Sequence, residues 1–295
     1  MGYHRDTTPF LDSMAEKGWH LSKLYANGPW TVPSHGALLT GLDPICSGLN
    51  YPYLFLHSEV PTLADTLRNA GYFCAALSNN PWVGKKTGLQ RGFDYFDETW
   101  RAYEPKSRLG TAWSDKKRLL LYADKGGRLV QDRMHDILEA RSKDKPLFLF
   151  INYMDVHPVC TPPPKYLRRF EGSSYHPHWM WTFAKGYYNA VYHYAGEWAL
   201  SNKQWENFIW LYDAAIAYLD DHIRLLCTEL IQSLGDNIAF IVTSDHGDSF
   251  NDHGHIGHQF SLYQNLLHVP GWVYGSPFEG RIREDPPLQL SDLFY

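Results

Sequence analysis

The stretch Ile238-Ala-Phe-Ile-Val-Thr-Ser-Asp-His-Gly247 carries the strongest structural signal in this chain. Its apolar, β-branched first half is typical of a fully buried strand. The run stops at polar residues, with Asp245 and His246 side by side before a glycine. In open α/β sheets, ligands bind beyond the carboxyl ends of the strands. We therefore expect a buried strand that ends in a binding site, and the alternative is an ordinary polar turn.

The rest of the chain alternates between helical and strand patterns. Strands are expected at 72–77 and at Leu147–Asn152, with amphipathic helices at 63–70 and 205–234. This alternation predicts an α/β fold whose mostly parallel sheet is covered by helices on both faces. The charged segment 105–133 and the aromatic segment 176–198 are expected to be insertions over the sheet edge or the site.

The composition excludes several classes of protein. The net charge is −5 and the pI is near 6.3, so the chain has no basic surface of the kind that binds nucleic acid. No apolar run reaches the length of a membrane span, and Met1 does not begin a signal peptide. The four cysteines have no Cys-x-x-Cys spacing, which favours free thiols in a reducing compartment. We therefore expect a cytoplasmic location; no pattern indicates an oligomeric state.

Polar residues recur where other strands are expected to end. They are Thr31 to His35 after Trp30, Asp155 and His157 after the Leu147–Asn152 strand, and His258 after the Asp245–His246 pair. A carboxylate oxygen together with imidazole nitrogens suits Zn²⁺ or Mn²⁺ better than Ca²⁺. This constellation predicts a divalent metal site. His253 and His255 are expected to be solvated loop residues.

The same segments resemble a known family. Thr31-Val-Pro-Ser-His-Gly-Ala-Leu-Leu-Thr-Gly41 is similar to the sulfatase signature, in which Cys or Ser, x, Pro, Ser and Arg precede a Leu-Thr-Gly ending. Met154-x-x-His157-Pro158, Ser244-Asp-His-Gly247 and Gly257-His258 follow in the order that family shows. The resemblance covers nearly the whole chain. It implies the sulfatase branch of the alkaline phosphatase superfamily, with a three-layer α/β/α sandwich and a metal-dependent site for sulfate or phosphate esters.

The resemblance also implies roles for individual residues. Thr31 holds the nucleophile position and is expected to share the metal with Asp245 and His246. His157 and His258 are expected to hold either a second metal or the non-bridging oxygens of the substrate. His35 and Asn80 are the expected substrate-binding residues, although Asn79-Asn80-Pro81 is also a common turn sequence.

This sequence departs from the family pattern at the nucleophile. Sulfatases oxidise a Cys or Ser there to formylglycine, and a threonine cannot yield that aldehyde, so no formylglycine is expected. The Arg of the signature is His35 here. At both positions the sequence resembles the threonine-nucleophile phosphodiesterases and phosphoryl transferases of the superfamily. A threonine before a proline is also an ordinary helix N-cap, which is the alternative for Thr31.

The ends of the chain depart from the pattern as well. Relatives open with a hydrophobic strand ending in acidic metal ligands, and Met1 falls after that point. We therefore expect residues 1–295 to be one sulfatase-type catalytic domain without its N-terminal strand and C-terminal subdomain, and to have low activity as written.

The expected function is metal-dependent hydrolysis of a small sulfate or phosphate ester. The metal is expected to be Zn²⁺, Mn²⁺ or Ca²⁺. Two alternatives remain open. One is a transferase that passes a phosphoryl headgroup to an acceptor alcohol, and the other is a catalytically silent binding protein.

Overall fold

A computed structural model describes residues 3–103, 125–158, 160–170, 190–197, 199–258, 260–276, 278 and 286–295. The helices are α1 (Pro9–Lys17), α2 (Thr31–Thr40), α3 (Pro44–Ser47), α4 (Leu63–Asn69), η1 (Thr99–Tyr103), α6 (Gly127–Ala140), α7 (Pro164–Phe170), α9 (Ala190–Tyr194), α10 (Asn202–Leu234), η2 (Asp252–Gly254), α11 (Gln264–Leu267) and η3 (Leu290–Phe294). The strands are β1 (Trp19–His20), β2 (Leu24–Tyr25), β3 (Leu49–Asn50), β4 (Tyr53–Leu54), β5 (Phe73–Ser78), β6 (Tyr95–Asp97), β7 (Leu147–Asn152), β8 (Ala239–Thr243), β9 (Ser249–Phe250), β10 (Ile256–Gly257), β11 (His268–Val269), β12 (Gly271–Gly275) and β13 (Leu288–Gln289).

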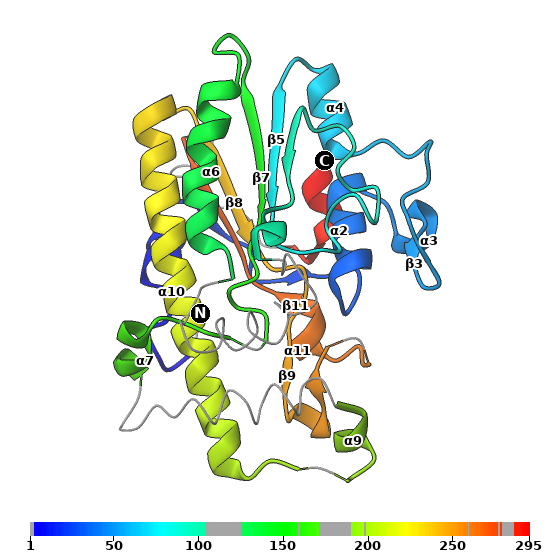
Figure 1. The fold of residues 1–295 in the computed structure, drawn as a ribbon, viewed down its shortest axis with the longest axis vertical. Helices are drawn as coiled ribbons and strands as arrows, with labels where there is room; N and C mark the ends of the chain where they lie inside the picture. The colour runs from blue at the N-terminus through cyan, green and yellow to red at the C-terminus, as the bar shows by residue number, and fades with distance from the viewer. Residues whose placement is uncertain are drawn as a thin grey trace.

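The centre of the fold is a set of strands with helices on both sides (Figure 1). Strands β6, β5 and β7 form a parallel sheet, in which β5 and β7 pair from Phe73↔Leu147 to Ser78↔Asn152. Beside them, β12 lies between β1 and β8 and pairs antiparallel with both. Helices α6 and α10 cover one face, and α2 and α4 lie on the other (Figure 1). The expected α/β/α sandwich is confirmed.

Local sequence signals explain where the long elements begin and end. Helix α10 starts at a capping box in which Ser201 and Gln204 bond each other's backbone N–H, and it stops at Gly235 (φ 83°). Its apolar face packs on α6 and the strands through a cluster that contains Met134, Leu226 and Leu230. Helix α4 also begins with a capping box, formed by Thr62 and Asp65. The packing of α6 and α10 on the strands holds the strand ends in place.

Strand β8 differs from its prediction as a fully buried strand. Phe240 and Val242 pack towards α1 and α10, but Ile241 on the opposite face is 52% exposed. Side chains alternate between the two faces of a strand, and only one face of β8 is covered. A continuous apolar run therefore does not guarantee burial on both faces.

Two predicted insertions fall largely outside the described residues. Of the segment 105–133, the structure describes only 125–133, most of it in α6. Of the segment 176–198, it describes 190–197, which contain α9. Within the described ranges, no helix is long and apolar enough to cross a membrane. All four cysteines are free thiols, as expected.

Asp220 of α10 joins the N-terminal helix to the core. It is 2% exposed, and its carboxylate accepts hydrogen bonds from the backbone N–H groups of Phe10 (2.9 Å) and Leu11 (3.0 Å). These are the first N–H groups of α1, whose N-cap residue Thr8 makes no side-chain cap bond. Asp220 therefore caps α1 from a distant part of the chain.

We expect Asp220→Ala to lower the free energy of unfolding by about 2 kcal/mol, because two N–H groups lose their acceptor. Urea denaturation followed by circular dichroism measures the change. Asp132→Ala, on the exposed side of α6, is the control and should change the free energy by less than about 0.5 kcal/mol. Equal stability of the two variants would contradict the capping role.

Candidate functional site

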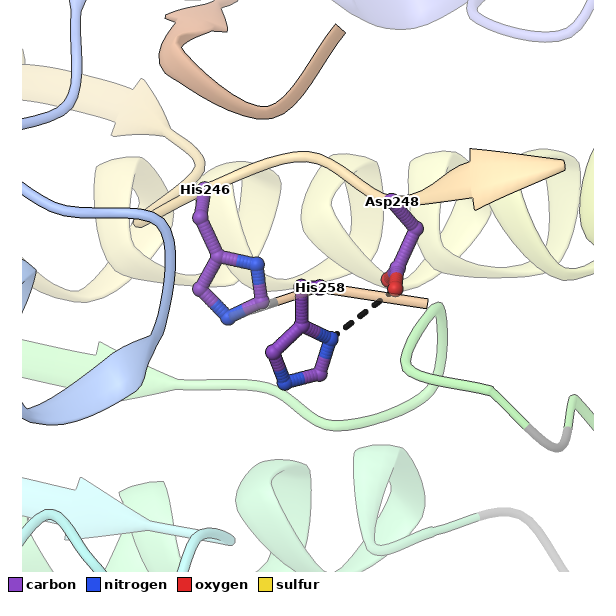
Figure 2. Close-up of side chains that lie close together, drawn as sticks. All are labelled: His246, Asp248 and His258. Atoms are coloured by element: carbon purple, nitrogen blue, oxygen red, sulfur yellow. Dashed lines mark hydrogen bonds and ion pairs between the residues drawn. The ribbon is translucent and has the colours of Figure 1, made fainter. Parts of the chain in front are cut away.

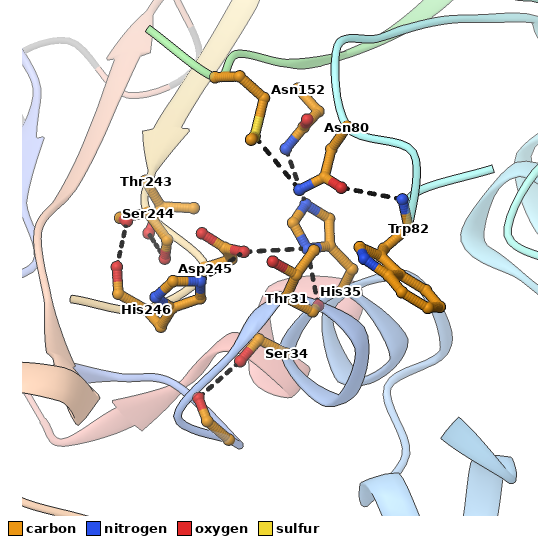
Figure 3. Close-up of polar contacts among 12 residues, drawn as sticks. Thr31, Ser34, His35, Asn80, Trp82, Asn152, Thr243, Ser244, Asp245 and His246 are labelled. Carbon is orange, nitrogen blue, oxygen red and sulfur yellow. Dashed lines mark hydrogen bonds and ion pairs between the residues drawn. The ribbon is translucent and has the colours of Figure 1, made fainter. Parts of the chain in front are cut away.

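The predicted site residues gather where β5, β7 and β8 end and α2 begins (Figure 3). Thr31 opens α2, Asp245 and His246 follow β8, and Asn80 follows β5. The backbone oxygen of Thr31 and Oδ2 of Asp245 lie 3.0 and 3.3 Å from the same atom, Nδ1 of His35. The structure therefore brings the predicted nucleophile and the predicted metal carboxylate together.

Thr31 is the first residue of α2 and does not cap it. The N-cap residue is Trp30, which makes no side-chain cap bond, and Thr31 is 5% exposed. Among the described residues, no hydrogen bond of the Thr31 hydroxyl is recorded. The N-cap alternative therefore finds no support, and the hydroxyl lies at the positive end of the helix dipole.

Asp245 and His246, the predicted metal ligands, face each other through Oδ2 and Nε2. Nδ1 of His246 lies 2.8 Å from the backbone oxygen of Gly247, which can only accept, so this nitrogen carries the hydrogen. Nε2 then presents a lone pair 3.4 Å from Oδ2 of Asp245. A lone pair and a carboxylate repel each other unless a cation or a proton lies between them. Two ligands at about 2.0–2.1 Å in a tetrahedral zinc shell are about 3.3 Å apart, which matches the observed separation.

Gly247 keeps this loop against the C-terminal segment. Its N–H donates to the backbone oxygen of Leu266 at 2.8 Å, and a Cβ at this position would lie 2.0 Å from the backbone oxygen of Asn265. Only glycine allows this approach without a shift of the backbone. The close contact fixes the carbonyl that orients His246.

The carboxylate of Asp245 stays ionised. Burial acts to raise the pKa of the Asp245 carboxyl, but the N–H of His35 that faces Oδ2 favours the ionised form. The same oxygen, Oδ2, is the one nearest to both rings. The contacts therefore place one carboxylate oxygen between two imidazole rings.

A second group of side chains adjoins this pair. Single ligand atoms of His246, Asp248 and His258 lie within 4.8 Å of one another (Figure 2). Nδ1 of His258 is 2.9 Å from Oδ1 of Asp248, and both side chains are 7% exposed. The rings of His246 and His258 lie 4.2 Å apart, centroid to centroid. His258 is therefore within reach of the predicted metal pocket.

His157 completes the row of imidazoles. Its ring centroid is 5.3 Å from that of His258, and its Nδ1 lies 2.5 Å from the backbone oxygen of Pro158. Burial, helped by the charge of Lys125, lowers the pKa of His157 to about 4. The ring is thus neutral at pH 7 and carries its hydrogen on Nδ1. In each of the three rings Nε2 is the nitrogen suited to bind a metal or accept a proton.

Asp248 was missed in the sequence. Strands β9 and β10 pair antiparallel with Gly257 opposite Ser249, which places the residue before Ser249 beside the residue after Gly257. Recognising Asn251 to Gly254 as the turn of a hairpin would have paired Asp248 with His258. His253 in this turn is exposed, as expected of a loop residue, whereas His255 is half-buried because its ring packs against Tyr194 and Tyr263.

Asn80 lies beside the site, but its amide makes local contacts. Its Oδ1 accepts from the backbone N–H of Trp82 at 2.9 Å, which is the turn interaction of an asparagine. Its Nδ2 lies 3.3 Å from Sδ of Met154. The turn alternative is therefore present in the structure, and the substrate-binding role of Asn80 stays a prediction.

Central strands between two helical layers, with an Asp-His pair after β8, are the arrangement of alkaline-phosphatase-like α/β proteins. The sulfatase family model matches residues 1–295, so this chain belongs to the sulfatase family. The chain is 23% identical to the uncharacterized sulfatase YidJ of Escherichia coli, over 97% of this chain and 61% of that protein. It is also 23% identical to the arylsulfatase of Klebsiella aerogenes, over 56% of this chain and 41% of that protein.

Solved structures share the fold. The phosphonate monoester hydrolase of Agrobacterium radiobacter superposes with a TM-score of 0.74 at 18% identity, over 99% of this chain and 68% of that chain. The C-terminal periplasmic domain of EptC from Escherichia coli, in complex with Zn, gives a TM-score of 0.67 at 17% identity, over 99% of this chain and 74% of that chain. Compared with its curated relative YidJ, the chain spans 61% of that protein's length.

Proposed function

We propose that this chain is a metal-dependent phosphoric ester hydrolase of the sulfatase family in which Thr31 is the nucleophile. The observation that carries the proposal is the facing pair of His246 Nε2 and Asp245 Oδ2, whose separation of 3.4 Å fits two ligands of one cation, next to the Thr31 segment. The phosphonate monoester hydrolases and the zinc-bound EptC domain among the structural neighbours are consistent with such chemistry on this fold.

The residues present fit a divalent metal. Asp245 supplies an ionised oxygen, His246 an oriented nitrogen, and Thr31 a hydroxyl beside them. When bound, the metal lowers the pKa of a hydroxyl and withdraws electrons from the ester. In this proposal Thr31 Oγ attacks phosphorus and displaces the ester alcohol, which leaves with a proton, and water then cleaves the phosphothreonine to release phosphate and restore Thr31. The N-terminus of α2 stabilises the negative charge of the transferred group.

His157 and His258 contribute basic nitrogens to the same site. Their Nδ1 atoms already donate to Pro158 and Asp248, so Nε2 of a neutral ring cannot donate to a substrate oxygen. Of the two roles expected for them, binding a second cation fits this geometry better than donating to non-bridging oxygens. Nε2 can also accept a proton from an attacking water.

We expect the purified protein to cleave an aryl phosphate or phosphonate at least about 10-fold more efficiently than an aryl sulfate. Sulfatases use the hydrated aldehyde of formylglycine, which Thr31 cannot form. A sulfated Thr31 would therefore release sulfate only by attack of water at sulfur. A phosphorylated Thr31 can be hydrolysed by a water molecule that the metal activates. The measurement is kcat/KM with 4-nitrophenyl phosphate, phenylphosphonate and sulfate, each with Zn²⁺ and with Mn²⁺. Sulfate cleavage equal to or faster than phosphate cleavage would contradict the proposal.

The same assay separates the alternatives. A headgroup transferase releases 4-nitrophenol faster when an acceptor alcohol is added, and a phosphorylated alcohol accumulates in place of inorganic phosphate. A silent binding protein takes up metal but turns over none of the three esters. Hydrolysis that is independent of the alcohol supports the proposed function.

A further inference from the structure

Two buried side chains, Asn152 and His35, form a chain of contacts that ends at the carboxylate of Asp245, whose side chain is 22% exposed. Nδ2 of Asn152, the last residue of β7, lies 3.1 Å from Nε2 of His35. Nδ1 of the same ring lies 3.3 Å from Oδ2 of Asp245 (Figure 3). His35 is 3% exposed and Asn152 is 9% exposed. The contacts connect the end of β7, the first turn of α2 and the loop after β8.

The hydrogen positions on His35 follow from its neighbours. Nδ1 faces two atoms that only accept hydrogen bonds, the backbone oxygen of Thr31 at 3.0 Å and the carboxylate of Asp245. Nδ1 must therefore carry a hydrogen. The amide N–H of Asn152 donates to Nε2 on the other side of the ring, which leaves the ring neutral.

Both ring nitrogens of His35 are thus used inside the protein. A substrate oxygen would need a donor, and the only N–H of this ring already points to Asp245 and Thr31. The ring also packs edge-on against Phe150 of β7, at 6.1 Å between centroids, so it has little room to turn. This geometry favours a positioning role over the substrate-binding role expected from the sequence.

We propose that Asn152 and His35 are positioning residues, in which Asn152 fixes the Nδ1–H tautomer of His35 and His35 orients the carboxylate of Asp245 towards the metal. The proposal rests on the proposed metal site and adds two residues that determine its affinity. Residues that orient metal ligands typically contribute 10- to 100-fold to metal affinity or activity.

The test compares two substitutions of similar size and polarity. In His35→Asn the amide nitrogen takes the place of Nδ1, and in His35→Gln it takes the place of Nε2. We expect His35→Asn to retain Zn²⁺ affinity within about 3-fold, and His35→Gln to lose about 10-fold or more. Asn152→Leu should lose affinity to a similar extent as His35→Gln. Affinity is measured by competition with a chromogenic chelator, and His57→Asn and His57→Gln, on an exposed ring, are the matched controls.

Nitrogen-15 spectra of histidine-labelled protein without metal give a second readout that needs no activity. The His35 signals, assigned by their loss in His35→Asn, should show a protonated Nδ1 and an unprotonated Nε2. In Asn152→Asp the new carboxylate accepts a hydrogen, and both nitrogens should become protonated.

Specific outcomes overturn the inference. They are a protonated Nε2 in the unsubstituted protein, equal loss of Zn²⁺ affinity in His35→Asn and His35→Gln, or a rise in KM with Zn²⁺ affinity unchanged. Failure of the proposed function looks different, because the protein then binds Zn²⁺ with the expected order of affinities but cleaves no ester.

Discussion

Thr31→Ala is expected to lower kcat/KM for an aryl phosphate by about 10³-fold or more, with Zn²⁺ binding still measurable. The alanine removes the hydroxyl that attacks phosphorus, while Asp245 and His246 remain in place as ligands. The loss should appear in kcat, because a nucleophile acts in the transition state and contributes little to substrate binding. Steady-state kinetics and a Zn²⁺ titration of the same preparation measure the two effects separately.

Two variants control for disturbance of helix α2. Thr31→Ser keeps the hydroxyl and should retain much of the activity. Thr40→Ala makes the same substitution at a buried position of the same helix, where the hydroxyl bonds the backbone oxygen of Gly36. Activity of Thr31→Ala comparable to that of Thr40→Ala would show that another group attacks the ester.

His246→Ala should weaken Zn²⁺ binding by at least about 100-fold and abolish turnover at micromolar metal. The substitution removes the lone pair that faces Asp245 and leaves the cation with one fewer ligand. Isothermal titration calorimetry with Zn²⁺ and metal analysis of the purified protein measure the change.

His253→Ala is the matched control, because His253 lies seven residues further along in the exposed turn and stacks on Tyr263 at 4.0 Å between centroids. It should bind Zn²⁺ as the unsubstituted protein does. The metal assignment is wrong if His246→Ala and His253→Ala bind Zn²⁺ equally.

Much of the fold follows from local sequence patterns. The apolar run 147–152 is strand β7 with the expected bounds, and the amphipathic patterns at 63–70 and 205–234 are helices α4 and α10 to within a few positions. Strand β12 was not predicted, although Gly271 to Gly275 lies beside β8. Pairing of strands depends on contacts between distant segments, which a single sequence does not reveal.

Some residues of the site could likewise be recognised from the sequence and others could not. The Asp245-His246 pair was recognisable because two ligand types adjoin at a strand end. Asn152 and Asp248 were not recognisable, because neither belongs to a sequence motif. Each is part of the site only through its contact with one histidine, His35 for Asn152 and His258 for Asp248. The role of His35 was predicted from the resemblance to a signature. Its buried contacts on both nitrogens, visible only in three dimensions, point to a different role.

The segments that meet at the site lie far apart in the chain, with Thr31 near one end and Asp245 and His246 near the other. A metal held by such residues binds the native protein and not the unfolded chain, so binding and folding are thermodynamically linked. Free metal at about 100 times its dissociation constant then adds about 2.7 kcal/mol to the free energy of unfolding. That is a substantial share of the total for a protein of marginal stability. If the proposed site holds a metal, we expect the concentration of free metal to set the fraction of folded protein as well as the fraction that is active.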